Sequence, residues 1–143
     1  MSKMTSQKIT NKKRFDEILL SDENELVIVN LSATWCGPCK QIAPHVDALA
    51  QKYMNKNVKI IKIDVDEAPD IAGLYQDDIS GIPAFIFYKQ GKAFSIINGA
   101  NLPAITKTLS DYFVQLEKII PEVKPEIKPK QVYIKELKQL DNF

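Results

Sequence analysis

Cys36 and Cys39 are the only cysteines in the chain, and Gly37 and Pro38 separate them. Two thiols at this spacing can close a small disulfide ring and open it again. Gly37 permits close approach of another chain, and Pro38 suits the first turn of a helix. Residues 1–13 are polar and lack the apolar stretch of a secretory signal, so we expect a reducing, cytoplasmic setting. There, a Cys-x-x-Cys pair beside a strand and a helix indicates redox chemistry.

A structural zinc site is one alternative interpretation of the pair. Such a site usually needs four protein ligands, with Cys and His preferred. The chain offers two cysteines and only His45, which we expect to be a partly exposed helical side chain. Asp64, Asp66 and Glu67 follow a strand, where acidic residues more often serve capping and solvation. We therefore assign no metal.

The cysteines lie where a predicted strand meets a predicted helix. Residues 26–31 form an apolar run broken only by Asn30, which is typical of a central strand buried on both faces. Apolar residues then recur at helical spacing at Ile42, Val46, Leu49 and Tyr53. Cys36 is thus predicted at a helix N-terminus, where free N–H groups and the helix dipole favour the attacking thiolate. Cys39, one turn inside, should be less exposed and should resolve the mixed disulfide.

The remaining patterns predict the element order β-α-β-α-β-α-β-β-α. The first helix is capped by Thr10 or Asn11 and runs to residue 20, and a second buried strand covers 58–65. A short helix lies near 71–75. Strands over 84–88 and 93–97 form a hairpin, and a last helix begins at 101. Helical crossovers imply parallel pairing, and the hairpin adds an antiparallel edge. The predicted fold class is α/β, a central mixed sheet flanked by helices on both faces.

Residues 26–40, followed by Ile42-Ala43-Pro44 and later by Gly81-Ile82-Pro83, closely resemble the thioredoxin family. The resemblance covers roughly residues 8–113 and implies a thioredoxin fold. It implies a thiol–disulfide oxidoreductase that reduces protein disulfides through the reversible Cys36–Cys39 pair, with no other cofactor. The implied partners are disulfide-containing proteins and a thioredoxin reductase or equivalent electron donor.

A substrate-docking surface is also implied by the resemblance. Ile82–Pro83 would form a cis peptide packed against the cysteines, leaving the backbone of Ile82 free to pair with an extended substrate. Trp35, Gly99 and Ala100 would complete this flat apolar surface.

Asn30 departs from the family pattern. Thioredoxins usually carry a buried aspartate at this position, assigned as the proton acceptor for the resolving cysteine, and asparagine cannot take a proton. Lys62 matches the lysine that accompanies that aspartate, so the region is one negative charge short. We hypothesise slower resolution, and a potential less negative than the about −270 mV of thioredoxin because the ammonium favours thiolate. Avoiding the desolvation cost of a buried carboxylate explains asparagine equally well.

We predict a thioredoxin domain over residues 1–116 and a Pro/Lys/Glu-rich extension over 117–143. The extension repeats Pro-Glu-x-Lys over 121–128, which predicts an extended spacer. Beyond it, Tyr133, Leu137 and Leu140 have the spacing of one short amphipathic helix. This end of the chain is either a solvated extension or a docking arm.

The charge balance limits the partners that we expect. The chain has 19 Lys and Arg against 18 Asp and Glu, which argues against nucleic acid. No apolar run reaches the roughly 20 residues of a membrane span, so we expect no membrane partner. Because fold does not fix function, the alternative is an interaction or assembly module on the same fold, with weak, more oxidising or isomerase-like activity.

Overall fold

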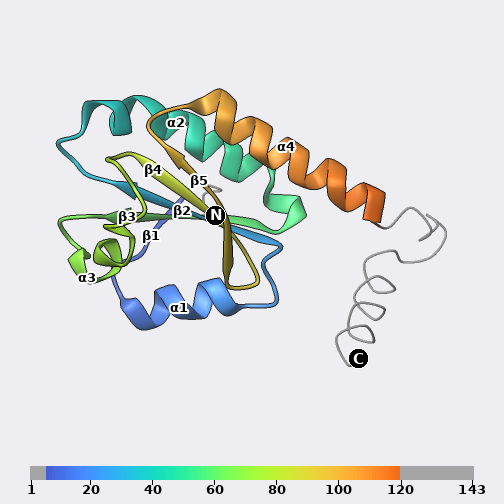
Figure 1. Ribbon diagram of the computed structural model, residues 1–143, viewed down its shortest axis with the longest axis horizontal. Helices are drawn as coiled ribbons and strands as arrows, with labels where there is room; N and C mark the ends of the chain where they lie inside the picture. The colour runs from blue at the N-terminus through green and yellow to red at the C-terminus, as the bar shows by residue number, and fades with distance from the viewer. Residues whose placement is uncertain (1–5, 120–143) are drawn as a thin grey trace. The chain divides into compact units, whose positions relative to one another are not determined.

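The computed structural model describes residues 6–119 (Figure 1). Its strands are β1 (Gln7–Lys8), β2 (Leu26–Ser32), β3 (Val58–Asp64), β4 (Ala84–Lys89) and β5 (Lys92–Asn98). Its α-helices are α1 (Lys12–Leu20), α2 (Gly37–Lys52), α3 (Pro69–Ala72) and α4 (Leu102–Ile119), with short 3-10 turns at Met54–Lys56 and Gly73–Tyr75. The element order is the one that the sequence predicts.

The five strands form one mixed sheet in the order β1-β3-β2-β4-β5. β1 and β2 both pair in parallel with β3, whereas β4 runs antiparallel to β2 and to β5. α1 and α3 cover one face of the sheet, and α2 covers the other (Figure 1). All seven residues of β2 are buried, as expected for a central strand.

Alternation along the strands gives the sheet two different faces. We call the side covered by α1 the α1 face and the side covered by α2 the α2 face. On the α1 face, strand residues pack with α1 and α3 into an apolar core that includes Val27, Val29, Leu31, Ile61, Ile63 and Ile86. The residues between them, including Ile28, Ile60, Phe85 and Phe87, are buried on the α2 face.

Local signals explain where several elements begin and turn. Asn11 caps α1, because its Oδ1 accepts a hydrogen bond from the N–H of Arg14 at 2.8 Å. The predicted hairpin is confirmed, and its tip, Gln90-Gly91, has φ angles of 50° and 81°. A tight hairpin turn requires positive φ angles at both central residues, and Gly91 adopts its positive φ without strain.

The chain divides into two compact units, residues 1–105 and 106–143. α4 begins in the first unit, where Asn101 Oδ1 accepts from the N–H of Ala104 at 3.1 Å, and its later turns belong to the second. The predicted Pro-rich spacer and the predicted helix at 133–140 lie outside the described residues. Within residues 6–119, no helix combines the length and apolarity needed to cross a membrane.

Candidate active site

A disulfide joins Cys36 to Cys39, whose Cα atoms lie 5.3 Å apart. Cys36 is the N-cap residue of α2, and its Sγ accepts a hydrogen bond from the N–H of Cys39 at 3.2 Å. Pro38 lies in the first helical turn, as its missing N–H and fixed φ favour. The predicted position of the pair at a helix N-terminus is therefore confirmed. In the reduced state the same N–H group would stabilise a thiolate at Cys36.

Exposure does not distinguish the two cysteines, contrary to the expectation for Cys39. Cys36 is 5% exposed and Cys39 is 4% exposed, because the closed ring packs both against Ala33, Val65 and Ile82. Their surroundings differ instead. The Sγ of Cys36 lies 3.9 Å from the carbonyl oxygen of Ile82, whereas Cys39 lines a pocket on the α2 face.

The backbone opposite Cys36 has the form that the resemblance implies. The Ile82–Pro83 peptide bond is cis, Pro83 is buried, and Ile82 is partly buried against the cysteine ring. Gly99 donates its N–H to the carbonyl oxygen of Pro83 at 2.7 Å and has a φ of 94°, a conformation that favours glycine. Ala100, the next residue, is exposed. The loop of the cis peptide and the end of β5 thus meet beside the disulfide.

Trp35 is the large exposed side chain of this surface. It is 66% exposed, and its indole Nε1 donates a hydrogen bond to Asp66 Oδ2 at 2.8 Å. The sequence interpretation gave Asp66 only a capping or solvation role and missed this contact. The available signal was the tryptophan itself, since its N–H needs a partner if the ring is to keep one orientation.

Four polar side chains lie together on the α2 face at the ends of two strands. In the parallel register of β2 and β3, Asn30 is opposite Lys62 and Ser32 is opposite Asp64. We call these four residues the polar cluster. Asn30, Ser32 and Asp64 are buried, and Lys62 is half-buried. The sequence predicted the Asn30/Lys62 pair but not the second pair beside it.

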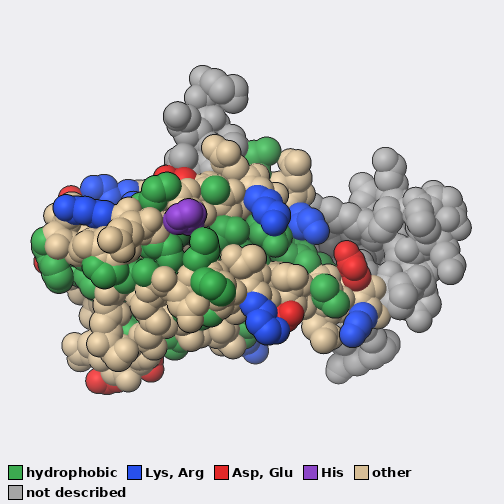
Figure 2. All heavy atoms as spheres, turned by 90° about the horizontal axis from the view of Figure 1, so that it is seen from above, with side chains coloured by type: hydrophobic (Ala, Val, Ile, Leu, Met, Phe, Trp, Pro, Cys, Tyr) green, Lys and Arg blue, Asp and Glu red, His purple; other side chains and the backbone are tan. Residues whose placement is uncertain are grey.

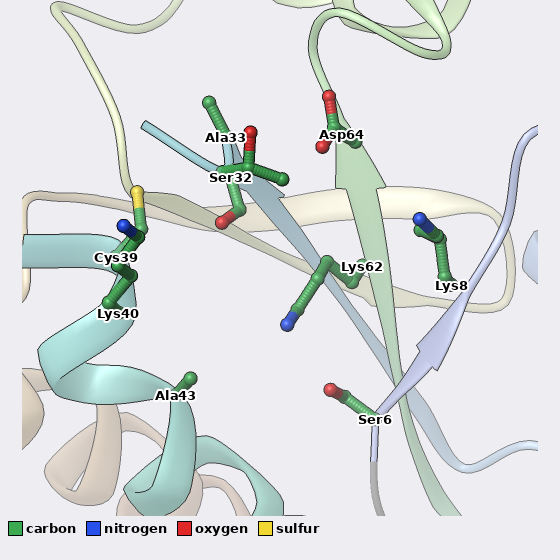
Figure 3. A pocket seen from close by; sticks show the side chains of 10 residues that line it. Ser6, Lys8, Ser32, Ala33, Cys39, Lys40, Ala43, Lys62 and Asp64 are labelled. Atoms are coloured by element: carbon green, nitrogen blue, oxygen red, sulfur yellow. The ribbon is translucent and has the colours of Figure 1, made fainter. Parts of the chain in front are cut away.

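Three residues of the polar cluster, Ser32, Lys62 and Asp64, line a pocket of about 370 Å³ under the first turn of α2 (Figure 3). Its lining includes Ser6, Ser32, Cys39, Lys40, Lys62 and Asp64. Figure 3 shows the Lys62 side chain extending from β3 toward α2. Lys8 also lines the pocket but pairs with Glu67 at 2.9 Å, and this hydrogen-bonded ion pair holds the pKa of Lys8 above its ordinary value.

Hydrogen bonding differs sharply within the polar cluster. Asp64 Oδ1 accepts from the N–H groups of Asp66 at 2.8 Å and Glu67 at 3.2 Å, so this carboxylate closes the turn after β3. It does not cap α3, whose N-cap is Ala68 without a side-chain hydrogen bond. Asn30 Oδ1 is buried and has no hydrogen bond within the described part of the chain. Asp64 therefore supplies a carboxylate to the pocket that asparagine at position 30 does not. The sequence prediction that this region is one negative charge short did not count the carboxylate of Asp64.

His45 is exposed on α2, as the sequence predicts, and it is the purple side chain of Figure 2. Residues 6–119 contain no group of three or more His, Cys, Asp or Glu side chains arranged to hold a metal ion.

Comparison with known proteins identifies the family of this chain. The thioredoxin family model matches residues 6–111, which include the disulfide, the polar cluster and the cis peptide. The chain belongs to the thioredoxin family. Thioredoxin of Oryctolagus cuniculus is 39% identical over 105 residues, which are 73% of this chain and 96% of that protein.

Solved structures of the family have the same fold. Mitochondrial thioredoxin 3 of Saccharomyces cerevisiae, in its oxidised form, is 37% identical, with a TM-score of 0.64 over 74% of this chain and 94% of that one. A chain from work on the thiol resolving mechanism in yeast mitochondrial 1-Cys peroxiredoxin via glutathione/thioredoxin systems is 35% identical. Its TM-score is 0.66 over 78% of this chain and 99% of that one.

Family membership and the Cys36–Cys39 disulfide together establish the activity class. The chain is a thiol–disulfide oxidoreductase, and its similarity to thioredoxins over most of its length makes it a protein-disulfide reductase.

Proposed function

We propose that Cys36 attacks the disulfide of a protein substrate and that Cys39 resolves the resulting mixed disulfide. The observation that carries this assignment is the N-cap position of Cys36, whose sulfur accepts the N–H of Cys39. That position favours the thiolate, and the thiolate is the nucleophile in exchange. Cys39, one helical turn later, is within disulfide distance of Cys36 and so can displace the substrate thiol.

The chemistry needs no group beyond the two thiols. Attack by Cys36 forms a Cys36–substrate disulfide and releases one substrate thiol. Attack by Cys39 forms the Cys36–Cys39 disulfide and releases the second thiol. The substrate gains two electrons and the enzyme loses two, so an electron donor such as a thioredoxin reductase must reduce the enzyme again. A role in cellular electron transport and redox homeostasis is part of this proposal.

Substrates dock, in this proposal, on the surface formed by Trp35, Ile82, Pro83, Gly99 and Ala100. Trp35 offers exposed apolar area held in place by Asp66, and Ile82 offers backbone groups to an extended chain. Disulfide-containing proteins are the substrate class. The yeast peroxiredoxin work supports peroxiredoxins as a first group to test.

Three further parts of the proposal rest on the sequence. The catalytic unit spans residues 1–116, with 117–143 as an extension to it. The protein acts in the cytoplasm, independently of nucleic acid and membranes. The Asn30/Lys62 pair gives the couple a less negative potential than about −270 mV, because Lys62 favours thiolate with no carboxylate at position 30. Fractionation of cells and a glutathione redox titration test the last two points.

Insulin reduction with dithiothreitol as electron source tests the assignment of the cysteines. Wild type should accelerate reduction, and Cys36→Ser should abolish the effect because a serine hydroxyl is not ionised at neutral pH. Cys39→Ser should instead trap substrates as mixed disulfides that are visible on non-reducing gels. Trapping by Cys36→Ser rather than Cys39→Ser would reverse the two roles.

A further inference from the structure

Polar burial in the described part of the chain is concentrated at one place. Asn30, Ser32 and Asp64 are its only buried polar or charged side chains, and all three belong to the polar cluster. Burying a polar group without a hydrogen bond costs about 1–3 kcal/mol, and burying an unpaired charge costs more. Three buried polar side chains beside the redox pair, of which only Asp64 has a side-chain hydrogen bond within the described residues, indicate a function that compensates for this cost.

Two atoms of the polar cluster remain free to move a proton. Asp64 Oδ1 is occupied by two backbone N–H groups, whereas no described residue hydrogen-bonds to its Oδ2. Ser32 Oγ likewise has no hydrogen bond within residues 6–119. Both residues line the pocket that Cys39 lines, and Figure 3 shows Ser32 at the end of β2 and Asp64 at the end of the neighbouring strand β3.

We propose that Asp64, acting through Ser32, receives the proton that Cys39 loses when it resolves the mixed disulfide. This inference rests on the proposed resolving role of Cys39. Asp64 would supply, from the neighbouring strand, the carboxylate that position 30 lacks. Asp64 acts through Ser32 in this step, and neither residue contacts the substrate.

The step balances without an added reagent. The sulfur of Cys39 bonds to the sulfur of Cys36, and the bond between Cys36 and the substrate sulfur breaks. The electron pair of the broken bond leaves with the substrate thiolate. The proton of Cys39 passes along the Ser32 hydroxyl, with pocket water completing the path where needed, to Asp64 Oδ2. From there it returns to the departing thiolate or to solvent.

Other groups in and beside the pocket do not suit this role. Asn30, which does not line the pocket, cannot accept a proton, and the lining residues Lys40 and Lys62 are donors in their charged form. Lys8 is held by Glu67, and Asp66 is held by the indole of Trp35. Asp64 is also the only carboxylate among the described residues that line the pocket.

Asp64→Asn is the decisive variant, because its amide oxygen can still accept the two N–H groups while the anionic oxygen is lost. Ser32→Ala removes the relay hydroxyl without touching that turn. Asp70→Asn, in the exposed first turn of α3, is the matched control for loss of one carboxylate. Circular dichroism confirms the fold of each variant.

The measurement uses the reduced full chain mixed with limiting dithiobis(nitrobenzoate) in a stopped-flow instrument. Attack by Cys36 releases the first thionitrobenzoate, and resolution by Cys39 releases the second. We expect Asp64→Asn and Ser32→Ala to slow the second phase about tenfold at pH 7, less than the roughly 100-fold lower end for loss of a general base, because pocket water can also take the proton. Their rates should approach wild type above about pH 8.5, where solvent ionises the thiol. Asp70→Asn should match wild type throughout.

Adding Asn30→Asp to Asp64→Asn should restore the fast second phase, because a carboxylate then returns to the α2 face beneath Cys39. A folded Asp64→Asn protein with the wild-type rate and pH profile would overturn this inference alone. A wild-type chain that releases only one equivalent, as Cys39→Ser should, would instead overturn the proposed resolving role as well.

Discussion

The two faces of β2 and β3 show how one pair of strands serves both stability and chemistry. On the α1 face, Val29 and Leu31 pack with Ile61 and Ile63 in a continuous apolar core. On the α2 face, the alternating positions of the same strand ends carry the polar cluster. Because successive side chains point to opposite faces, each function occupies its own set of positions.

Polar groups on the two faces are also satisfied differently. The hydroxyls of Tyr75 and Tyr88, which pack with the α1 core, lie 2.6 Å apart and hydrogen-bond to each other. Asn30 Oδ1, on the α2 face, has no such bond with a described residue. A closed polar pair suits a structural core, whereas a buried acceptor without a hydrogen bond calls for a functional explanation. Substitutions on the two faces should therefore have different consequences.

Ile61→Ala should give the largest change in stability. Ile61 is fully buried on the α1 face, so truncation should lower the free energy of unfolding by about 2–5 kcal/mol. The second-phase rate of the folded protein at 25 °C should stay at the wild-type value, because the polar cluster is on the other side of the sheet. Urea unfolding and stopped-flow exchange measure the two effects. A slower second phase in a fully folded sample would show that the faces are coupled.

Asn30→Leu should stabilise the protein, in contrast to the truncation on the α1 face. Leucine has nearly the same shape and removes a buried amide oxygen that lacks a hydrogen bond within the described chain, so we expect a gain of about 1–2 kcal/mol. The urea midpoint should rise. Asn55→Leu, at an exposed position, should change stability by less than about 0.5 kcal/mol. A lower midpoint for Asn30→Leu would mean that the amide is well satisfied.

Lys62→Met should shift the redox potential with little change in packing, because methionine keeps the length of the apolar stem. Loss of the ammonium from the pocket beside Cys39 should make the potential more negative by about 20 mV, equivalent to about 1 kcal/mol. Equilibration with glutathione buffers measures it. Lys59→Met, on the same strand but among the positions of the α1 face, is the control and should leave the potential unchanged. Equal shifts in both variants would rule out a local effect of Lys62.

Tyr75→Phe should have the smallest effect at neutral pH, a loss of about 0.5–1 kcal/mol from the broken hydroxyl pair. Burial, followed by the hydrogen bond with Tyr88, raises the pKa of Tyr75 above its ordinary value. Tyr75 therefore stabilises the fold below about pH 10, and this stabilisation is lost as the pH rises further, because the unfolded chain releases the proton first. Between pH 7 and a pH above 10, the urea midpoint should fall less in Tyr75→Phe than in wild type. An equal fall of the urea midpoint with pH in both proteins would contradict a raised pKa of Tyr75 in the folded state.

The sequence predicts much of this fold because its strongest signals are local. The buried run of β2 and the helical spacing after Cys39 lie within single elements, so periodicity alone places Cys36 at a helix N-terminus. β1 appears in the predicted order but could not be assigned to residues, since it has only two, both exposed. β1 is defined by its pairing with β3, and its own two residues carry no periodic signal.

The site was predicted where a family motif marks it and missed where the sheet register creates it. The pairing of Ser32 with Asp64 depends on how β2 aligns with β3, and a carboxylate at the end of a strand looks the same in sequence whether or not it faces a pocket. The bond from Trp35 to Asp66 joins residues 31 positions apart. Neither contact leaves a periodic signal, so both require the folded chain.

Trp35 gives the protein an optical reporter of its own. It is the only tryptophan in the chain, it adjoins Cys36, and the hydrogen bond to Asp66 fixes its largely exposed indole. All indole fluorescence therefore comes from one position next to the redox pair. Opening and closing of the disulfide can be followed in real time on the unlabelled chain, and substrate docking should be visible in the same signal.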